Sequence, residues 1–336
     1  MTFNQCASNE KELLASVVQW ASHRNWRELD QNTLAGIAQQ EGIDFATALL
    51  YSRLLHSSEH GPTIRRLERC DTDGIPKHDV AEFRIGIVPG GLHQESRDSR
   101  ECLNCVYGEL QRHGFAAEII PTASFGPLHD NAGVIVEWLS AVSEPTIVVS
   151  LSKGGAETKL ALKQNPTAFR NVRVWIDASG LLEGSEWVTW LLDRTISNLG
   201  ARFWSWFHWR RGYRFSTLQE LRRGPGTMLN FDVIIPGHMT AFRIVGFPLT
   251  NDLTYRYSKR SHMRLTPRGP SDGIGIMLGD LTRWPGAIYP VWRADHFLRP
   301  TGQTICDFVG KVVHHVMSNE LKQSSAESQV ESVPRA

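Results

Sequence analysis

The sequence predicts an α/β fold in which a mostly parallel sheet carries helices on both faces. Two observations predict it. Short apolar runs that suit buried strands recur from residue 83 onward, and stretches of helical length and periodicity separate them. Parallel strands need long connections, and a helix between consecutive strands supplies them. We therefore expect right-handed crossovers between neighbouring strands.

The expected elements follow in a regular order. The first strand lies in Phe83-Arg-Ile-Gly-Ile-Val-Pro-Gly-Gly91, an apolar run that ends in glycines. The elements after it are a helix over 97–113, a strand over 115–120, a helix over 131–142, a strand over 145–150, a helix over 157–163 and a strand over 172–176. Later apolar runs over 242–249 and 287–292 predict two more strands.

The chain divides into three parts. Residues 1–80 form a helical N-terminal extension, because apolar residues recur there at helical spacing and no strand pattern precedes residue 80. Residues 81–317 form the α/β domain, with a long insertion at about 180–235 between the fourth and fifth strands. The polar segment 318–336 is expected to be a mobile tail.

Composition argues against several classes of protein. The 336 residues include 36 Lys+Arg and 35 Asp+Glu, a net charge of +1, whereas nucleic-acid-binding domains usually carry a basic excess. No apolar run approaches the roughly 20 residues that span a bilayer. The N-terminus lacks the basic region and apolar core of a secretory signal. We expect a soluble, cytoplasmic protein with no nucleic-acid partner.

The five cysteines do not look like a disulfide framework. Cys102 and Cys105 form a C-x-x-C within the expected helix 97–113, and Cys6, Cys70 and Cys306 are scattered singly. A structural zinc site would need two more ligands at suitable spacing. We expect buried packing of the Cys102–Cys105 pair and no bound metal.

A serine follows the third strand in the setting of a nucleophile elbow. The run Thr146-Ile-Val-Val-Ser-Leu-Ser-Lys-Gly-Gly155 leads from an apolar strand through a sharp turn into a helix. Ser152 takes the nucleophile position of the usual G-x-S-x-G pattern, and Ser150 replaces its first glycine. An ordinary serine-glycine turn is the alternative. The backbone N–H of Lys153, at the helix N-terminus, would face a developing oxyanion.

Two further segments belong to the same edge of the expected sheet. Val88-Pro-Gly-Gly-Leu92 follows the first strand, and glycines there let the N–H of Gly91 or Leu92 point into a site. His296 follows the last strand, in Ala294-Asp-His-Phe297. The serine and the histidine are therefore expected to meet at the carboxyl ends of the strands.

On the VPGGL, SLSKGG and ADHF segments, the chain from about residue 83 to 317 resembles an α/β-hydrolase of the lipase/esterase kind. The resemblance implies a Ser-His-acid triad, no cofactor, and acyl transfer to water through an acyl-enzyme. It implies no particular substrate, because this fold supports many chemistries. The N-terminal helices lie outside it.

Four aspartates are candidates for the acid. Asp272, in Pro270-Ser-Asp-Gly-Ile274, resembles the acid turn of lipases and is favoured. Asp177 ends the fourth strand, where a minority of lipases carry the acid. Asp252 directly follows the strand over 242–249, and Asp280 lies nearer to the histidine.

The mechanism that the resemblance implies assigns one role to each residue. His296 takes the proton of Ser152 as the hydroxyl attacks a carbonyl, and Asp272 fixes the imidazole tautomer. The N–H groups of Lys153 and of Gly91 or Leu92 would hold the oxyanion. The predicted function is hydrolysis of a carboxylic ester or thioester. An acyltransferase with the same triad and a non-catalytic binding protein of the same fold are the alternatives.

The insertion combines aromatic and basic side chains. Trp204, Trp206 and Trp209 lie in residues 201–224, which also contain six arginines and one acid. A cap helix whose tryptophans cover an acyl pocket is the favoured interpretation. An element that contacts an anionic membrane surface comes second, and a nucleic-acid patch is disfavoured. A packing helix with snorkelling arginines is the plainest alternative.

Overall fold

The computed structural model describes residues 3–20, 24–69, 83–208, 213–299 and 305–317. Its centre is a six-stranded sheet with the order β2-β1-β3-β4-β5-β6. The strands are β1 (Arg84–Val88), β2 (Ala116–Ile119), β3 (Thr146–Leu151), β4 (Val172–Ala178), β5 (Thr240–Phe247) and β6 (Ala287–Trp292). All neighbouring strands pair in parallel, so their carboxyl ends share one edge. The strands expected from the sequence are present, with ends that differ by about two residues at most.

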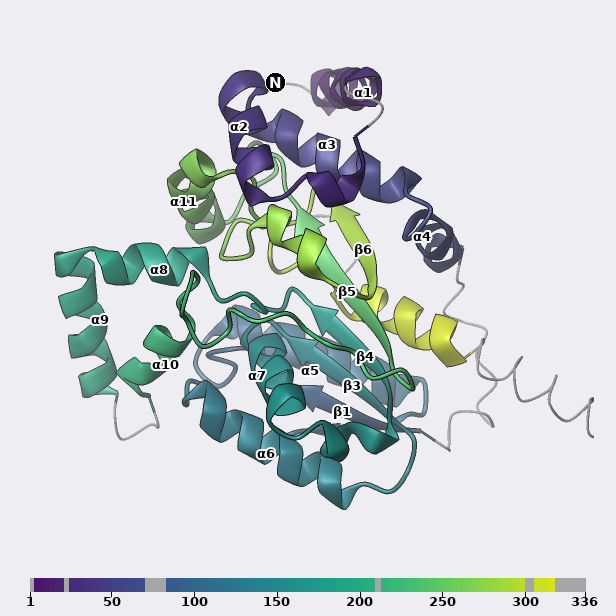
Figure 1. Cartoon of the computed structure of the whole chain (residues 1–336), viewed down its shortest axis with the longest axis vertical. Helices are drawn as coiled ribbons and strands as arrows, with labels where there is room; N and C mark the ends of the chain where they lie inside the picture. Colours follow the sequence, from purple (N-terminus) through teal and green to yellow (C-terminus); the bar gives the residue numbers. More distant parts are fainter. Residues whose placement is uncertain (1–2, 21–23, 70–82, 209–212, 300–304, 318–336) are drawn as a thin grey trace, which may run out of the picture.

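Helices cover both faces of the sheet (Figure 1). One face packs against α4 (Gly61–Glu68), α5 (Arg97–Arg112) and the helical residues 305–317. The other face packs against α6 (Leu128–Ala141) and α7 (Lys153–Gln164). In β3, Ile147 and Val149 belong to the first core and Val148 to the second. A strand buried on both faces alternates its side chains between two cores, and this explains the continuous apolar run in the sequence.

The N-terminal helices α1 (Phe3–Gln19), α2 (Gln31–Glu41) and α3 (Ile43–His56) share the core of the α6–α7 face. Helix α3 packs on β5 and β6. Polar contacts add to this packing. The carboxylate of Asp44 accepts hydrogen bonds from the backbone N–H and hydroxyl of Thr250, both at 2.8 Å. The extension is therefore built into the domain that follows it, a packing that the sequence did not indicate.

The described residues of the insertion between β4 and β5 include the helices α8 (Glu186–Asp193), α9 (Thr195–Phe207) and α10 (Phe215–Glu220). Helix α11 (Arg256–Leu265) follows β5 and packs against α8. These helices lie together on the left side of Figure 1. The expected tail 318–336 and Trp209 lie outside the described residues. No helix among the described residues has the length and hydropathy that crossing a membrane requires.

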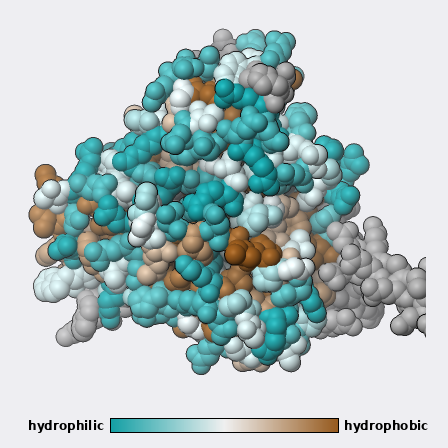
Figure 2. All heavy atoms as spheres, in the orientation of Figure 1, coloured by the Kyte–Doolittle hydropathy of each residue, from teal (hydrophilic) through white to brown (hydrophobic). Residues whose placement is uncertain are grey.

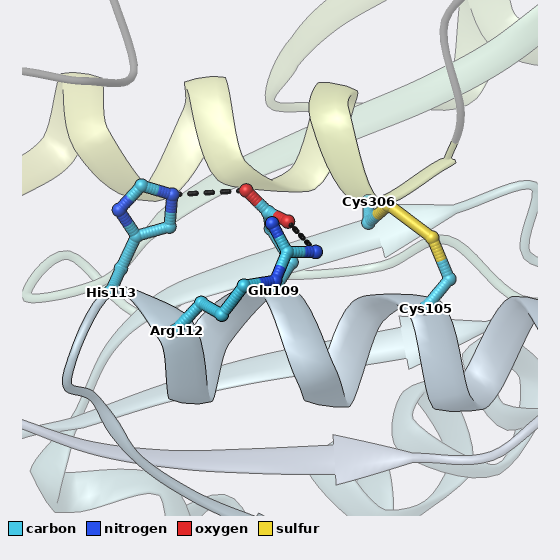
Figure 3. Close-up of a disulfide and its surroundings, with 5 residues drawn as sticks. All are labelled: Cys105, Glu109, Arg112, His113 and Cys306. Carbon is cyan, nitrogen blue, oxygen red and sulfur yellow. Dashed lines mark hydrogen bonds and ion pairs between the residues drawn. A yellow bond between two sulfur atoms is a disulfide. The ribbon is translucent and has the colours of Figure 1, made fainter.

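A disulfide joins α5 to the helical residues 305–317 (Figure 3), and it corrects the expectation that the cysteines only pack. Cys105 and Cys306 are bonded across 201 residues of sequence, with 5.6 Å between their Cα atoms. Local spacing could not reveal this pair, because only the fold brings the two helices side by side. Cys102 keeps a free thiol. Disulfides are typical of oxidising compartments, so this one does not favour the expected cytoplasmic location.

Candidate active site

Ser152 occupies a strained turn between β3 and α7. Its backbone has φ 48° and ψ −114°, a combination that side-chain-bearing residues rarely adopt. Three backbone hydrogen bonds of 3.0 Å hold the turn. The N–H of Ser152 donates to the carbonyl of Ala178, and the N–H groups of Gly155 and Leu181 donate to the carbonyl of Ser152. The loop after β4 therefore stabilises the conformation that lifts the serine above the sheet edge.

Gly154 and Gly155 allow this turn because no side chain fits at either position. A Cβ on Gly154 would lie 2.6 Å from the carbonyl oxygen of Val88, and one on Gly155 would lie 2.3 Å from Oδ1 of Asp177. The first turn of α7 can therefore approach the ends of β1 and β4 only with glycine at both positions. This close approach is the physical reason for the Lys-Gly-Gly that follows the serine.

The structure brings Ser152, His296 and Asp272 into one line of hydrogen bonds. The Oγ of Ser152 lies 2.9 Å from Nε2 of His296, and Nδ1 of His296 lies 2.5 Å from Oδ2 of Asp272. An ionised carboxylate only accepts hydrogen bonds, so Nδ1–H donates to Asp272. Nε2 is then the unprotonated nitrogen and accepts a hydrogen bond from the Ser152 hydroxyl. This tautomer is the one that a general base requires.

The carboxylate of Asp272 is fully buried and rigidly held. Its second oxygen, Oδ1, accepts the backbone N–H groups of Ile274, Gly275 and Ile276 at 3.0, 2.9 and 3.0 Å. Burial acts to raise the pKa of Asp272. The charge and hydrogen bond of His296, together with the backbone N–H groups, outweigh burial and hold that pKa below its ordinary value. Asp272 therefore stays ionised in a dry environment.

The pKa of His296 moves the opposite way. Burial of the imidazole acts to lower it, but the charge and hydrogen bond of Asp272 outweigh burial and raise the pKa above its ordinary value. Asp295 and Asp177 contribute to the same rise. A raised pKa strengthens the imidazole as a base, so the pair is tuned for accepting a proton from Ser152.

The other candidate aspartates have different partners. Asp177 accepts from the Ser150 hydroxyl at 2.9 Å and forms an ion pair with Arg243 at 3.3 Å. Asp252 pairs with Arg293 and Asp280 with Arg223, each at 2.6 Å. None of these three carboxylates has a hydrogen bond to His296 among the described contacts. Asp177 instead lies beneath the elbow, where burial raises its pKa to about 6 despite Arg243.

Two of the three expected oxyanion donors are free to act. The N–H groups of Gly91 and Lys153 have no backbone hydrogen-bond acceptor in the part of the chain that the structure describes. The N–H of Leu92 donates to the carbonyl of Ser124 at 3.0 Å, which corrects the expectation that Leu92 could serve. The side chain of Lys153 is buried and ion-paired with Glu157. Lys153 can therefore contribute its backbone N–H to the site, while its ammonium group is ion-paired with Glu157.

Two cavities lie beside Ser152. The larger, of about 520 Å³, is bordered by the insertion and is apolar. Its wall includes Phe125, Val188, Leu191, Trp204, Leu218 and Leu221. The smaller, of about 350 Å³, also borders His296 and is more polar. Its wall includes Ser96, Asp98, Ser99, Tyr255, Tyr257 and Phe297. Gly91 borders both cavities.

Of the two expected pocket tryptophans that the structure describes, Trp204 borders the apolar cavity. Trp206 is 72% exposed and does not border it, which corrects that expectation. Trp204 and Trp206 lie on different sides of α9, because residues two positions apart in a helix of 3.6 residues per turn point in nearly opposite directions. Val188 and Leu191 of α8 were missed, although their helical spacing within the insertion was a readable signal. Tyr255 and Tyr257 carried no signal in the sequence.

No protein-family model matches the chain, and no curated protein does either. Solved structures do match. The lipase of Staphylococcus hyicus aligns with a TM-score of 0.52 at 9% identity, over 75% of this chain and 99% of that one. A metagenomic carboxyl esterase aligns with a TM-score of 0.50 at 17% identity, over 71% of this chain and 76% of that one. The strand order of the sheet and these alignments indicate the same fold.

The chain has an α/β-hydrolase fold. In this fold, the candidate site lies at the carboxyl edge of the sheet, where Ser152 follows β3 and His296 follows β6. Asp272 comes from the segment between α11 and β6. Among the described residues, no group of three or more metal-ligating side chains is arranged to hold an ion. The chemistry that these residues can perform by themselves is proton abstraction from a serine hydroxyl beside two free N–H donors.

Proposed function

We propose that this protein is a serine hydrolase that cleaves a carboxylic ester or thioester through an acyl-enzyme. The observation that carries the proposal is the line of hydrogen bonds from Ser152 through His296 to Asp272 at a strained turn. A serine hydroxyl is a poor nucleophile unless a base lies within hydrogen-bond reach. The 2.9 Å separation between Oγ and Nε2 meets that requirement.

In the first half of the reaction, Oγ of Ser152 attacks the substrate carbonyl while Nε2 of His296 accepts the hydroxyl proton. Asp272 stabilises the imidazolium that forms. The N–H groups of Gly91 and Lys153 bind the oxyanion, and losing one such donor costs about 2.7–4 kcal/mol. The intermediate collapses when the imidazolium gives its proton to the departing alcohol or thiol, which leaves the acyl group on Ser152.

In the second half, water replaces the alcohol or thiol. His296 accepts a proton from the water as its oxygen attacks the acyl carbonyl, and the same two N–H groups bind the second oxyanion. The proton then passes from His296 to Oγ of Ser152 as the carboxylic acid leaves. The enzyme returns to its starting state, and the proposed steps consume only the ester or thioester and one water molecule.

The two cavities suggest how a substrate is oriented. The apolar cavity bordered by Trp204 suits the acyl chain, because burying apolar area there yields roughly 25 cal/mol per Å². The polar cavity bordered by Asp98 and Tyr255 suits the leaving group. A volume of about 520 Å³ exceeds what an acetyl group fills. We therefore expect esters of longer acids to be better substrates than acetates.

Labelling with a fluorophosphonate probe tests the proposal. Ser152 should react covalently, and Ser152→Ala should remove both labelling and hydrolysis of p-nitrophenyl esters. His296→Ala should suppress labelling, because the hydroxyl loses its base. Ser99→Ala is the matched control, since Ser99 also borders the polar cavity but has no contact with His296 among the described hydrogen bonds. Peptide mapping identifies the labelled serine.

Two results would contradict the proposal. Labelling at a serine other than Ser152 would contradict the assignment of the nucleophile. A folded, monodisperse protein that neither labels nor hydrolyses any ester of the series would favour a non-catalytic binding role. Product analysis with an added short alcohol distinguishes hydrolysis from acyl transfer, because the second reaction yields a new ester.

A further inference from the structure

Helix α9 has an apolar stripe that faces solvent. One side of the helix, with Ser197, Gly200, Ala201 and Trp204, borders the apolar cavity. A second stripe follows the spacing i, i+3, i+7, i+10, i+11 and therefore forms one continuous strip along the helix. Its members and their exposed fractions are Ile196 88%, Leu199 62%, Phe203 66%, Trp206 72% and Phe207 69%. We call these five residues the outer stripe.

The outer stripe is unusual for a protein surface. Single exposed apolar side chains are common, but a contiguous group with three aromatic rings marks an interaction site. Figure 2 shows brown, hydrophobic atoms at its left edge, in the region where α9 lies in Figure 1. Because the three aromatic side chains are mostly exposed, they contribute little to packing within the chain. They indicate a partner that takes up apolar rings.

Helix α11, which packs against α8, supplies positive charge. Its exposed side chains include Arg256, Lys259, Arg260 and Arg264, and the helix contains no acid. Within the described part of the chain, no ion pair involves any of these four cations. Several other surface arginines do have carboxylate partners, such as Arg97 with Glu101. The α11 cations are thus available to an external anion.

Trp190 of α8 joins the two features. The guanidinium of Arg194, beside the start of α9, lies 4.6 Å from the Trp190 ring centre, and that of Arg264 on α11 lies 4.5 Å from it. Helix α8 also contacts both α9 and α11. The helices that carry the outer stripe and the α11 cations therefore both pack against α8, and all three helices lie on the left side of Figure 1.

We infer that the outer stripe and the α11 cations together bind an anionic lipid surface. Aromatic and aliphatic side chains enter the boundary between headgroups and acyl chains, while arginine and lysine meet the phosphates. The charge complementarity selects this partner, because a neutral apolar partner would gain nothing from four unpaired cations. The inference extends the proposed function, since the inner side of α9 borders the cavity assigned to the acyl chain.

Vesicle co-sedimentation of the full chain tests the inference. The probes are vesicles of phosphatidylcholine alone and vesicles with about one third phosphatidylglycerol. The protein should sediment with the anionic vesicles and should not sediment with the neutral ones. Binding should weaken as the salt concentration rises from about 0.1 to 0.5 M. Each cation near such a surface strengthens binding about fivefold, so Arg256→Gln/Lys259→Gln/Arg260→Gln should weaken it roughly a hundredfold.

A matched control removes equal charge elsewhere. Arg65→Gln/Arg66→Gln/Arg69→Gln changes three exposed cations at α4, which lies on the right of Figure 1, and should bind vesicles like the wild type. The outer-stripe variant Phe203→Gln/Trp206→Gln should keep the salt-dependent attraction but bind more weakly at high salt. Ser152→Ala should bind normally, so failure of the proposed catalysis and failure of this inference are distinguishable.

Three outcomes would overturn the inference. The first is equal loss of binding in the α4 and α11 variants, which would indicate a general charge effect. The second is equal binding of the wild type to neutral and anionic vesicles, or none to either. The third is a stable dimer in light scattering that the outer-stripe variant converts to a monomer, because the stripe would then be a contact between two copies of this chain.

Discussion

Replacing Asp272 with asparagine tests the candidate triad most directly. Three backbone N–H groups donate to Oδ1, so only an oxygen can take that position and the new amide must turn its NH₂ group toward His296. Nδ1 of His296 then has to accept a hydrogen bond, and the ring proton moves to Nε2. An imidazole protonated at Nε2 cannot take the proton of Ser152. We therefore expect kcat to fall about ten-thousandfold, about 5.5 kcal/mol.

The same variant should change the pH dependence in a defined direction. Only the neutral imidazole is a base, so the rate rises with pH through the pKa of His296. Burial lowers that pKa, and in the wild type the charge of Asp272 outweighs burial and raises it. Without that charge burial dominates, so the acid limb should move to lower pH. The assay is kcat/KM for a p-nitrophenyl ester between about pH 5 and 9.

Asp280→Asn is the control for this prediction. It removes an equal charge from a buried carboxylate that pairs with Arg223 instead of His296. Its kcat/KM should stay within about threefold of the wild type, in the range of changes outside the reacting groups. The reasoning is refuted if Asp272→Asn folds normally and keeps more than about a tenth of the activity, or if its acid limb does not move.

Three further predictions concern the pocket, the elbow and the disulfide. Trp204→Ala should slow the hydrolysis of long-chain esters more than that of acetate, whereas the exposed Trp206→Ala should leave the chain-length profile unchanged. Gly154→Ala should abolish labelling of the nucleophile, since its Cβ meets the carbonyl of Val88; normal labelling would show that the turn adapts. Cys105→Ser should lower the free energy of unfolding by about 2–4 kcal/mol, measured by chemical denaturation, and Cys102→Ser should have little effect.

Features set by local sequence were predictable. The alternation of apolar runs with helical stretches indicated the parallel sheet, because burial on both faces leaves a continuous apolar strand. Ser152 stood out as a candidate because a strained strand-to-helix turn needs glycines next to it, and those glycines are neighbours in the chain. His296 stood out because it directly follows the last strand. These signals lie within a few residues of the position that they describe.

Features set by contacts between distant segments were not predictable. Asp272 was favoured among four aspartates only through its resemblance to the acid turn of lipases, because residue type and spacing alone do not determine which carboxylate meets the imidazole. The N–H of Leu92 is occupied by a carbonyl from the loop after β2, and Cys105 finds Cys306 only when two helices pack on one sheet face. The sequence by itself determined which elements form and which residues carry reactive groups. The tertiary structure decided which of those groups meet, because their separation in space depends on the packing of the whole chain.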